Sequence, residues 1–431
     1  MGDTSLRRLH FWIAFFATLF LFTLSASADT LQQQIDKTPV GGTLTLFDRE
    51  YMETAVIKKP ITIIGGEETL LMSDSDKPVF TIKNAENVTL KGLHFLQSNA
   101  AVVVKNSSKI QLDKLEMIQM FSGVQVYDSK DVTIKGLTLK GIDGQFASKG
   151  YGLAVFKSSN VTLDHNNVTS VQDAYYLEHT KDVTVTNNIA TDSRYGLHFM
   201  YADGIKAEHN TLKRNVTGIM LMLAKNASLR YNDISLQWDW NSSGFTLYNA
   251  ENIVAENNVF SGNRTGILSQ TLKNAQIQHN IFSSNQTAIE FTAADKNNTV
   301  TNNDFVGNIL NIRSDGSDSR IDKNYYDDYD GNDIDDNGVG DTNYVALQSF
   351  GQWMVREPAY QYFIESPAVI MLNQMDKQTN RVETNQLVDS TPMMEPTNAF
   401  HKEYAFHLWS FLIGLIMLTG AIFLWRKGVK Q

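Results

Sequence analysis

Short apolar segments recur along the middle of the chain at a nearly constant spacing. Each segment opens with a small residue and then alternates between two faces; the opening residues are Gly152, Ala174, Gly196, Gly218, Gly244, Gly266 and Ala288. Successive openings are 22 residues apart, except for one interval of 26. A polar corner and a second strand-like stretch follow each segment, and no helical periodicity interrupts them. This repeat predicts an all-β fold, a right-handed parallel β-helix whose coils each take about 22 residues.

A leucine-rich repeat is the alternative fold for a period of this length. Its units would need leucines at fixed offsets and a helix on the convex side, and the chain shows no such helical pattern. Recognisable coils run from about Ile57 to Ile321, which corresponds to 11 or 12 coils. We therefore predict the β-helix within residues 29–344.

Asparagine returns at one corner of the repeat. The positions are Asn166, Asn188, Asn210, Asn232, Asn258, Asn280, Asn303 and Asn324. Stacked asparagines can hydrogen-bond one another through their side-chain amides, and asparagine tolerates a left-handed backbone bend. We expect a structural asparagine ladder at this corner, with the bend at the asparagine itself.

The two ends of the chain indicate export and membrane attachment. Arg7 and Arg8, an apolar run over 11–24 and the small residues at 26–28 form a secretory signal peptide over residues 1–28. Residues 405–425 read as a transmembrane helix, and the basic residues that follow them place the C-terminus in the cytoplasm. The body is therefore expected in the periplasm or at the outer face of the cytoplasmic membrane.

Both open ends of a β-helix core need a cover. Residues 31–35 are expected to cap the first coil. Residues 345–404 are expected to form a capping segment and linker, in which aromatic residues cover the last coil: Trp353, Tyr360, Tyr362 and Phe363. Met393 and Met394, in the same segment, are either copper ligands or plain linker residues.

Alternation along the strands assigns each position to the core or to the surface. Leu197 and Phe199 belong to columns that are almost entirely apolar and face the core, so the side chains between them must face outward. The outward set of interest is His198, Met200, Met220 and Met222. Two adjacent strands would place these side chains side by side, about 5 Å apart between backbones. Thioether and imidazole ligands suit Cu(I), so the sequence predicts a copper-contact patch.

An apolar docking surface is the competing interpretation of the same face. Aromatic and acidic residues lie in the neighbouring outward columns: Phe156, Tyr176, Glu178 and Tyr248. Methionine is common on adaptable binding surfaces. The two interpretations are compatible if a partner transfers the metal there.

An acidic loop follows the last coil. Asp333, Asp335, Asn337 and Asp341 match positions one, three, five and nine of a calcium-binding loop. Position twelve falls on Tyr344 instead of a glutamate. The alternatives are a calcium site and a Gly- and Asp-rich turn that closes the coil stack.

Composition narrows the chemistry further. The chain has no cysteine, which excludes disulfides, thiolate metal sites and cysteine nucleophiles. Its net charge of -10 argues against a nucleic-acid-binding surface. No Gly-rich loop ends in the Gly-Lys-Ser/Thr of an ATPase.

Four segments, in this order behind a signal peptide, resemble the NosD family of β-helix proteins of nitrous oxide reductase maturation: RYGLHFMYAD, NTLKRNVTGIMLML, NYYDDYDGNDIDDNGVGD and SPAVIMLNQM. The resemblance covers roughly residues 30–375. It implies a non-enzymatic role in supplying copper to nitrous oxide reductase, in complex with the membrane subunit and ATPase of an ABC transporter and with a copper-chaperone lipoprotein as donor. The transmembrane segment lies outside the matching region.

A polysaccharide lyase, epimerase or hydrolase is the competing function on this fold. Such an enzyme needs paired carboxylates, or a calcium-binding aspartate cluster with a basic proton abstractor. Glu178 and Glu290 lie in the outward columns but five coils apart. A purely structural rod is the third interpretation.

Overall fold

A computed structural model describes residues 29–73, 75–292, 295–314, 318–346, 358–363, 366–378 and 387–398. The predicted signal peptide, the predicted transmembrane helix and Trp353 lie outside these ranges. Within them, no helix is long and apolar enough to cross a membrane.

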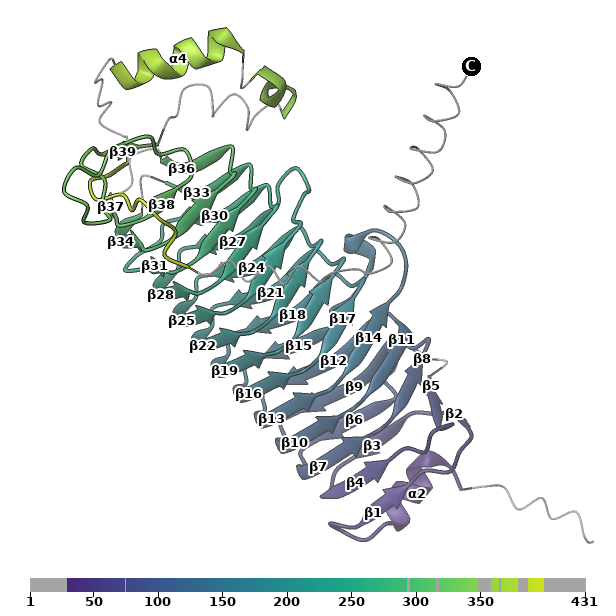
Figure 1. The fold of residues 1–431 in the computed structure, drawn as a ribbon. Helices are drawn as coiled ribbons and strands as arrows, with labels where there is room; N and C mark the ends of the chain where they lie inside the picture. The colour runs from purple at the N-terminus through teal and green to yellow at the C-terminus, as the bar shows by residue number, and fades with distance from the viewer. Residues whose placement is uncertain are drawn as a thin grey trace, which may run out of the picture. The chain divides into compact units, whose positions relative to one another are not determined.

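Three parallel sheets run along the molecule and form the walls of a β-helix (Figure 1). The first sheet contains, in spatial order, β1 (Thr43–Thr45), β4 (Ile61–Ile64), β7 (Glu86–Lys91), β10 (Ser108–Asp113), β13 (Lys130–Lys135), β16 (Ser159–Asp164), β19 (Lys181–Thr186), β22 (Asp203–Glu208), β25 (Lys225–Arg230), β28 (Glu251–Glu256), β31 (Gln276–Gln278), β34 (Lys296–Thr301) and β37 (Asp318–Asp322).

The second sheet contains β2 (Glu50–Met52), β5 (Leu70–Met72), β8 (His94–Leu96), β11 (Glu116–Met120), β14 (Thr138–Gly141), β17 (Asn167–Thr169), β20 (Ile189–Thr191), β23 (Thr211–Lys213), β26 (Asp233–Ser235), β29 (Val259–Ser261), β32 (Ile281–Ser283), β35 (Asp304–Val306) and β38 (Tyr325–Tyr326). The third sheet contains β3 (Ala55–Ile57), β6 (Phe80–Lys83), β9 (Ala100–Lys105), β12 (Ser122–Tyr127), β15 (Leu153–Phe156), β18 (Asp173–Glu178), β21 (Tyr195–Met200), β24 (Thr217–Met222), β27 (Ser243–Tyr248), β30 (Thr265–Gln270), β33 (Thr287–Phe291) and β36 (Leu310–Ser314).

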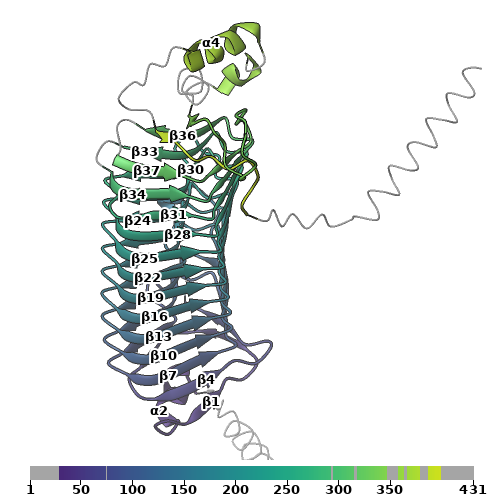
Figure 2. The same cartoon turned by 60° about the vertical axis from the view of Figure 1, so that its left-hand side comes forward.

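Every third strand in the sequence is a neighbour in space, which is the topology of a β-helix and confirms the predicted all-β solenoid. Consecutive coils stack in parallel register, as the regular steps in Figure 2 show. The first coil already begins at Thr43, so the solenoid has 13 strands in two of its sheets, rather than the 11 or 12 coils expected. Short β1 and β2 lack the strong apolar alternation that marked the later coils.

The asparagine ladder is present and buried. Asn188 Nδ2 donates to Asn210 Oδ1 over 3.1 Å and to the carbonyl of Leu163 over 2.8 Å. The left-handed bend, however, lies one residue earlier than expected: His209, for example, has φ 56° and precedes Asn210. The residue before each ladder asparagine takes the left-handed bend in the same way.

A second ladder at another corner was not predicted. Its buried members are Asn215, Gln237, Asn263 and Asn285, with the half-buried Asn308 at its end. Gln237 interrupts the asparagine pattern there, and its longer side chain still reaches the carbonyl of Leu212 over 2.8 Å. In the coils that contain them, the two ladders satisfy buried backbone groups at two corners.

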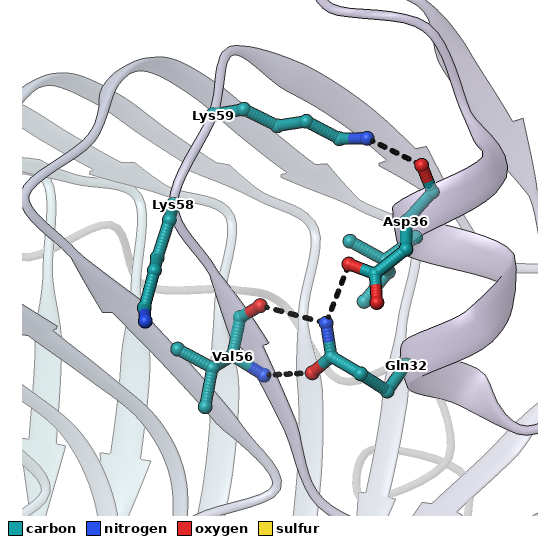
Figure 3. A pocket seen from close by; sticks show the side chains of 6 residues that line it. Gln32, Asp36, Val56, Lys58 and Lys59 are labelled. Carbon is teal, nitrogen blue, oxygen red and sulfur yellow. Dashed lines mark hydrogen bonds between the residues drawn. The ribbon is translucent and has the colours of Figure 1, made fainter.

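Helix α2 (Leu31–Lys37) caps the first coil, as predicted. Leu31 and Ile35 are buried in the core. The Gln32 amide accepts from the Val56 nitrogen over 2.7 Å and donates to its carbonyl, so it pairs with the free edge of β3 as a strand would (Figure 3). A pocket beside this contact is lined by Gln32, Ile35, Asp36, Val56, Lys58 and Lys59.

The other end is closed in part by Val388 and Asp389, which lie in the predicted capping segment, and in part by Tyr344. Tyr344 stacks on Tyr326 with ring centroids 3.6 Å apart, and β39 (Tyr344–Val345) pairs with β40 (Val388–Asp389). Buried Asp389 ends the first ladder by accepting from the Asn324 nitrogen over 3.0 Å. Tyr360, which is 41% exposed, and Phe363, which is 53% exposed, do not cover the core. These two lie in a 3-10 helix, η2 (Pro358–Phe363), which precedes α4 (Pro367–Gln378); a second 3-10 helix, η1 (Phe146–Ser148), lies between β14 and β15.

Candidate functional site

The predicted copper-contact residues lie on adjacent strands of the third sheet. In the register of β21 and β24, His198 pairs with Met220 and Met200 pairs with Met222. Leu197, Phe199 and Leu221, which alternate with them, are fully buried in the core. The alternation therefore assigned the outward face correctly.

Outward-facing does not mean exposed here. His198 is only 7% exposed and Met220 only 9% exposed, whereas Met200 and Met222 are half-buried. Aromatic rings cover the imidazole edge-on from both sides: its centroid lies 4.8 Å from that of Tyr176 and 4.9 Å from that of Tyr195. The predicted open patch is instead a site whose inner donors are shielded from solvent.

A buried carboxylate holds the imidazole. Asp173 Oδ2 lies 2.9 Å from His198 Nδ1, and Arg194 donates to both carboxylate oxygens over 2.7 and 2.8 Å. Asp173 is fully buried. His198 Nε2 is also buried, and among the residues that the structure describes it has no hydrogen-bond partner. A buried polar nitrogen without a partner is costly, so this atom is the strongest sign of a ligand at the site.

The arginine is held in place on a second side. Its guanidinium lies over the Tyr195 ring, 4.4 Å from the centroid. Burial alone would lower the pKa of Arg194, but the hydrogen bonds to Asp173 raise it above its usual value. The pair is therefore a charged, bidentate contact beneath the imidazole.

Tyr176 links the imidazole to the first methionine sulfur. Its hydroxyl lies 2.8 Å from Glu178 Oε2 and 3.6 Å from Met200 Sδ, in donor geometry to each. Burial and the hydrogen bond to Glu178 raise the pKa of Tyr176 well above its usual range, so the hydroxyl stays protonated. Tyr176 thus contacts both the Met200 sulfur, through its hydroxyl, and the His198 ring.

The predicted docking residues surround these donors on the same face. Phe156 pairs with Glu178 in the strand register, and its ring stacks on Tyr127 with centroids 4.8 Å apart. Tyr248 pairs with Met222 on the far side. The aromatic and methionine residues thus form one continuous strip across β12 to β27.

Three residues of the site were missed by sequence reasoning: Asp173, Arg194 and Tyr195. They precede or open the strands, outside the columns that were aligned. A signal was present in the column that pairs Asp173 with Tyr195, because its later members are Thr217, Ser243, Thr265 and Thr287. Asp173 and Tyr195 differ from the small hydroxyl residues of the rest of this column, and that difference could have drawn attention to them.

The acidic loop is closed by its own hydrogen bonds. Asp333 accepts from the backbone nitrogens of Asn337 over 3.1 Å and Gly338 over 2.8 Å. Asn337 donates to Asp335, and Asp341 accepts from the Ile334 nitrogen over 2.6 Å. Among the residues that the structure describes, no three His, Cys, Asp or Glu side chains converge as a metal-binding group. The calcium site in this loop stays a prediction.

The fold and the site define a class: a parallel β-helix that carries a histidine and three methionines side by side on one outer sheet and, in the described part of the chain, no converging group of three His, Cys, Asp or Glu side chains. Residues 139–344 match the model of the family described as "Periplasmic copper-binding protein (NosD)". That range contains His198, all three methionines of the strip and the acidic loop. The match supports the resemblance: residues 139–344 of the chain are similar to the NosD family.

Two solved structures with a similar fold are those of an epimerase and an exopolygalacturonase. The chain is similar to the A-module of the mannuronan C-5 epimerase AlgE4 of Azotobacter vinelandii, with 17% identity, a TM-score of 0.51 and coverage of 68% of this chain and 94% of that one. It is also similar to an exopolygalacturonase of Thermotoga maritima, with 9% identity, a TM-score of 0.48 and coverage of 66% and 84%. At such identities the likeness concerns the fold alone. No curated protein matches the chain.

Proposed function

We propose that the chain is an extracytoplasmic copper-handling accessory protein, which works with an ABC transporter to deliver Cu(I) for the maturation of nitrous oxide reductase. The observation that carries the proposal is His198 Nε2, a buried nitrogen without a partner, on a strand paired with two methionines. The family that residues 139–344 match is that of a periplasmic copper-binding protein, which supports the same cargo and location.

The donor set fits Cu(I) better than a hard ion. Imidazole nitrogen and thioether sulfur are the ligands that soft Cu(I) accepts, whereas calcium and magnesium require oxygen. A chain without cysteine offers these donors without the risk of oxidation to disulfides. His198 and Met220 would form the inner part of the site, and the less buried Met200 and Met222 the outer part.

The aromatic strip favours transfer between proteins over storage. Phe156, Tyr248 and the half-buried methionines present an adaptable, largely apolar surface next to the donors. A copper-chaperone lipoprotein would dock there as donor, and nitrous oxide reductase as acceptor. The chain has no ATP-binding loop of its own, so the transporter's ATPase would supply the energy that changes which partner is bound.

We propose a binding platform rather than an enzyme. On the third sheet, Glu178 and Glu290 are separated by five strand steps, and Glu290 pairs with Arg313 over 3.5 Å. A glycoside-cleaving pair would need its carboxylates within about 5–10 Å of each other. Predicted anchoring by residues 405–425 would keep the platform beside the transporter at the membrane.

The test is a competition titration of the purified full chain with Cu(I) against a chromophoric Cu(I) chelator. The triple variant Met200→Leu, Met220→Leu, Met222→Leu should bind Cu(I) at least about tenfold more weakly, because leucine keeps the packing but removes the sulfur. Met52→Leu is the matched control, since Met52 is exposed on β2 of another sheet. Equal Cu(I) affinity of all three proteins would refute the proposal. Depolymerisation of a uronic-acid polymer by the wild-type chain would replace it with the polysaccharide function.

A further inference from the structure

Asp173 is a buried ionisable residue that the proposed function does not yet use. We infer that Asp173 is a positioning residue, which holds the His198 imidazole in the tautomer with the proton on Nδ1 and so leaves the Nε2 lone pair free as the metal donor. The inference deepens the proposed function and rests on it for the identity of the metal. The tautomer itself follows from the contacts of the metal-free chain.

The hydrogen bonds around Asp173 determine which atom carries the proton. Arg194 approaches its two oxygens in parallel, over 2.7 and 2.8 Å. Arginine is always charged and can only donate, and this fork geometry is that of a guanidinium on an ionised carboxylate. An ionised carboxylate can only accept, so across the 2.9 Å contact His198 Nδ1 must be the donor.

The opposite nitrogen of the imidazole, His198 Nε2, then carries no proton. A neutral imidazole carries one proton, so a proton on Nδ1 means a lone pair on Nε2. A second proton on Nε2 would be buried without an acceptor, because that atom has no partner in the structure. The edge-on rings of Tyr176 and Tyr195 restrain the imidazole from rotating. Orientation by a carboxylate on the far nitrogen is the common arrangement of metal-binding histidines.

The experiment begins with the metal-free wild-type chain, labelled with ¹⁵N at histidine. Long-range ¹H–¹⁵N NMR distinguishes the two tautomers, and the variant His198→Gln identifies the signal by its loss. The expected spectrum shows a protonated Nδ1 and an unprotonated Nε2 for His198. A proton on Nε2 would overturn the inference, and this measurement does not depend on the folding of any charge variant.

The variant Asp173→Asn tests the consequence for the metal. An asparagine amide can donate as well as accept, so it no longer dictates the tautomer, and Cu(I) affinity should fall about 10- to 100-fold. Asp192→Asn is the matched control, because Asp192 also pairs with an arginine in bidentate fashion, Arg214 over 2.9 Å, but at an exposed corner. A Cu(I) affinity of Asp173→Asn no lower than that of Asp192→Asn would overturn the positioning role.

The two hypotheses fail in distinguishable ways. If the wild-type chain shows the expected tautomer but binds no Cu(I), the proposed function fails while the role of Asp173 in setting the tautomer stands. If the chain binds Cu(I) and Asp173→Asn weakens it no more than Asp192→Asn does, the copper function stands and the positioning role is refuted.

Discussion

Asn232 in the middle of the first ladder is the sharpest test of how the β-helix is held together. Its side chain accepts from the Asn210 nitrogen and the Asn210 amide, both over 3.0 Å. It donates to the Ala207 carbonyl over 3.0 Å and to the Asn258 side chain over 2.9 Å. The residue is 1% exposed, so water does not replace these bonds in the folded chain.

Replacing Asn232 with alanine does not orphan all four partners. The Asn210 side-chain amide still donates to the Val185 carbonyl. The Asn258 side-chain oxygen still accepts a hydrogen bond from the backbone nitrogen of residue 232. Two buried groups lose these contacts, the Asn210 nitrogen and the Ala207 carbonyl. The Ala207 carbonyl lies inside β22, which pairs with β25, so the Asn210 nitrogen is the group that becomes unsatisfied. At about 1–3 kcal/mol for one such group, the free energy of unfolding should fall by about 1–3 kcal/mol.

Urea denaturation followed by circular dichroism measures this change. Asn167→Ala is the control, because Asn167 is exposed on β17, and surface substitutions of this kind stay within about 0.5 kcal/mol. If Asn232→Ala lowered the free energy of unfolding no more than the control does, the ladder would not be a stabilising element and the reasoning would be wrong.

Three further predictions concern the end of the ladder, a corner and a close approach. Asp389→Ala removes the acceptor for the Asn324 nitrogen and amide, over 3.0 and 3.1 Å, so limited proteolysis should cut residues 387–397 faster than in the wild type. Burial raises the pKa of Asp164, but hydrogen bonds from neighbouring side chains outweigh burial and lower this pKa to about 2. This stabilisation is complete above the unfolded value of about 4 and is lost as the pH falls towards 2, so Asp164→Asn should flatten the acid limb of a pH-dependent melting curve. Gly218→Ala would place a Cβ 2.6 Å from the Gly244 carbonyl oxygen, and calorimetry should show a loss of about 1–3 kcal/mol; an unchanged melting temperature would contradict the close approach.

Much of the fold could be predicted because the repeat forces each strand beside its equivalents. A 22-residue period with alternating apolar positions admits one stacking, which places His198 beside Met220 and Met200 beside Met222. The ladder followed from the same argument, since a buried amide at every turn can bond only to the next. The predicted signal peptide, transmembrane helix and partners stay predictions.

The closure of the last coil could not be read from the sequence. Tyr360 and Phe363 were expected to help cover it but are exposed, whereas Tyr344 and Asp389 contribute to the closure. Asp389 lies 65 residues after Asn324, and no local pattern announces such a contact. Asp389 accepts from the nitrogen and the side-chain amide of Asn324, the last asparagine of the ladder. These groups are placed for that contact only once the coils are stacked.

The sequence by itself determined the coil, the face on which each side chain lies and the choice of soft donors, because alternation and period are local rules of a strand. Only the tertiary structure decided that His198 is buried, that Asp173 and Arg194 lie against it and that its Nε2 has no partner. Burial and hydrogen bonding depend on residues from neighbouring coils, such as Asp173 of the coil before His198. Those contacts convert an outward-facing histidine into a candidate metal donor.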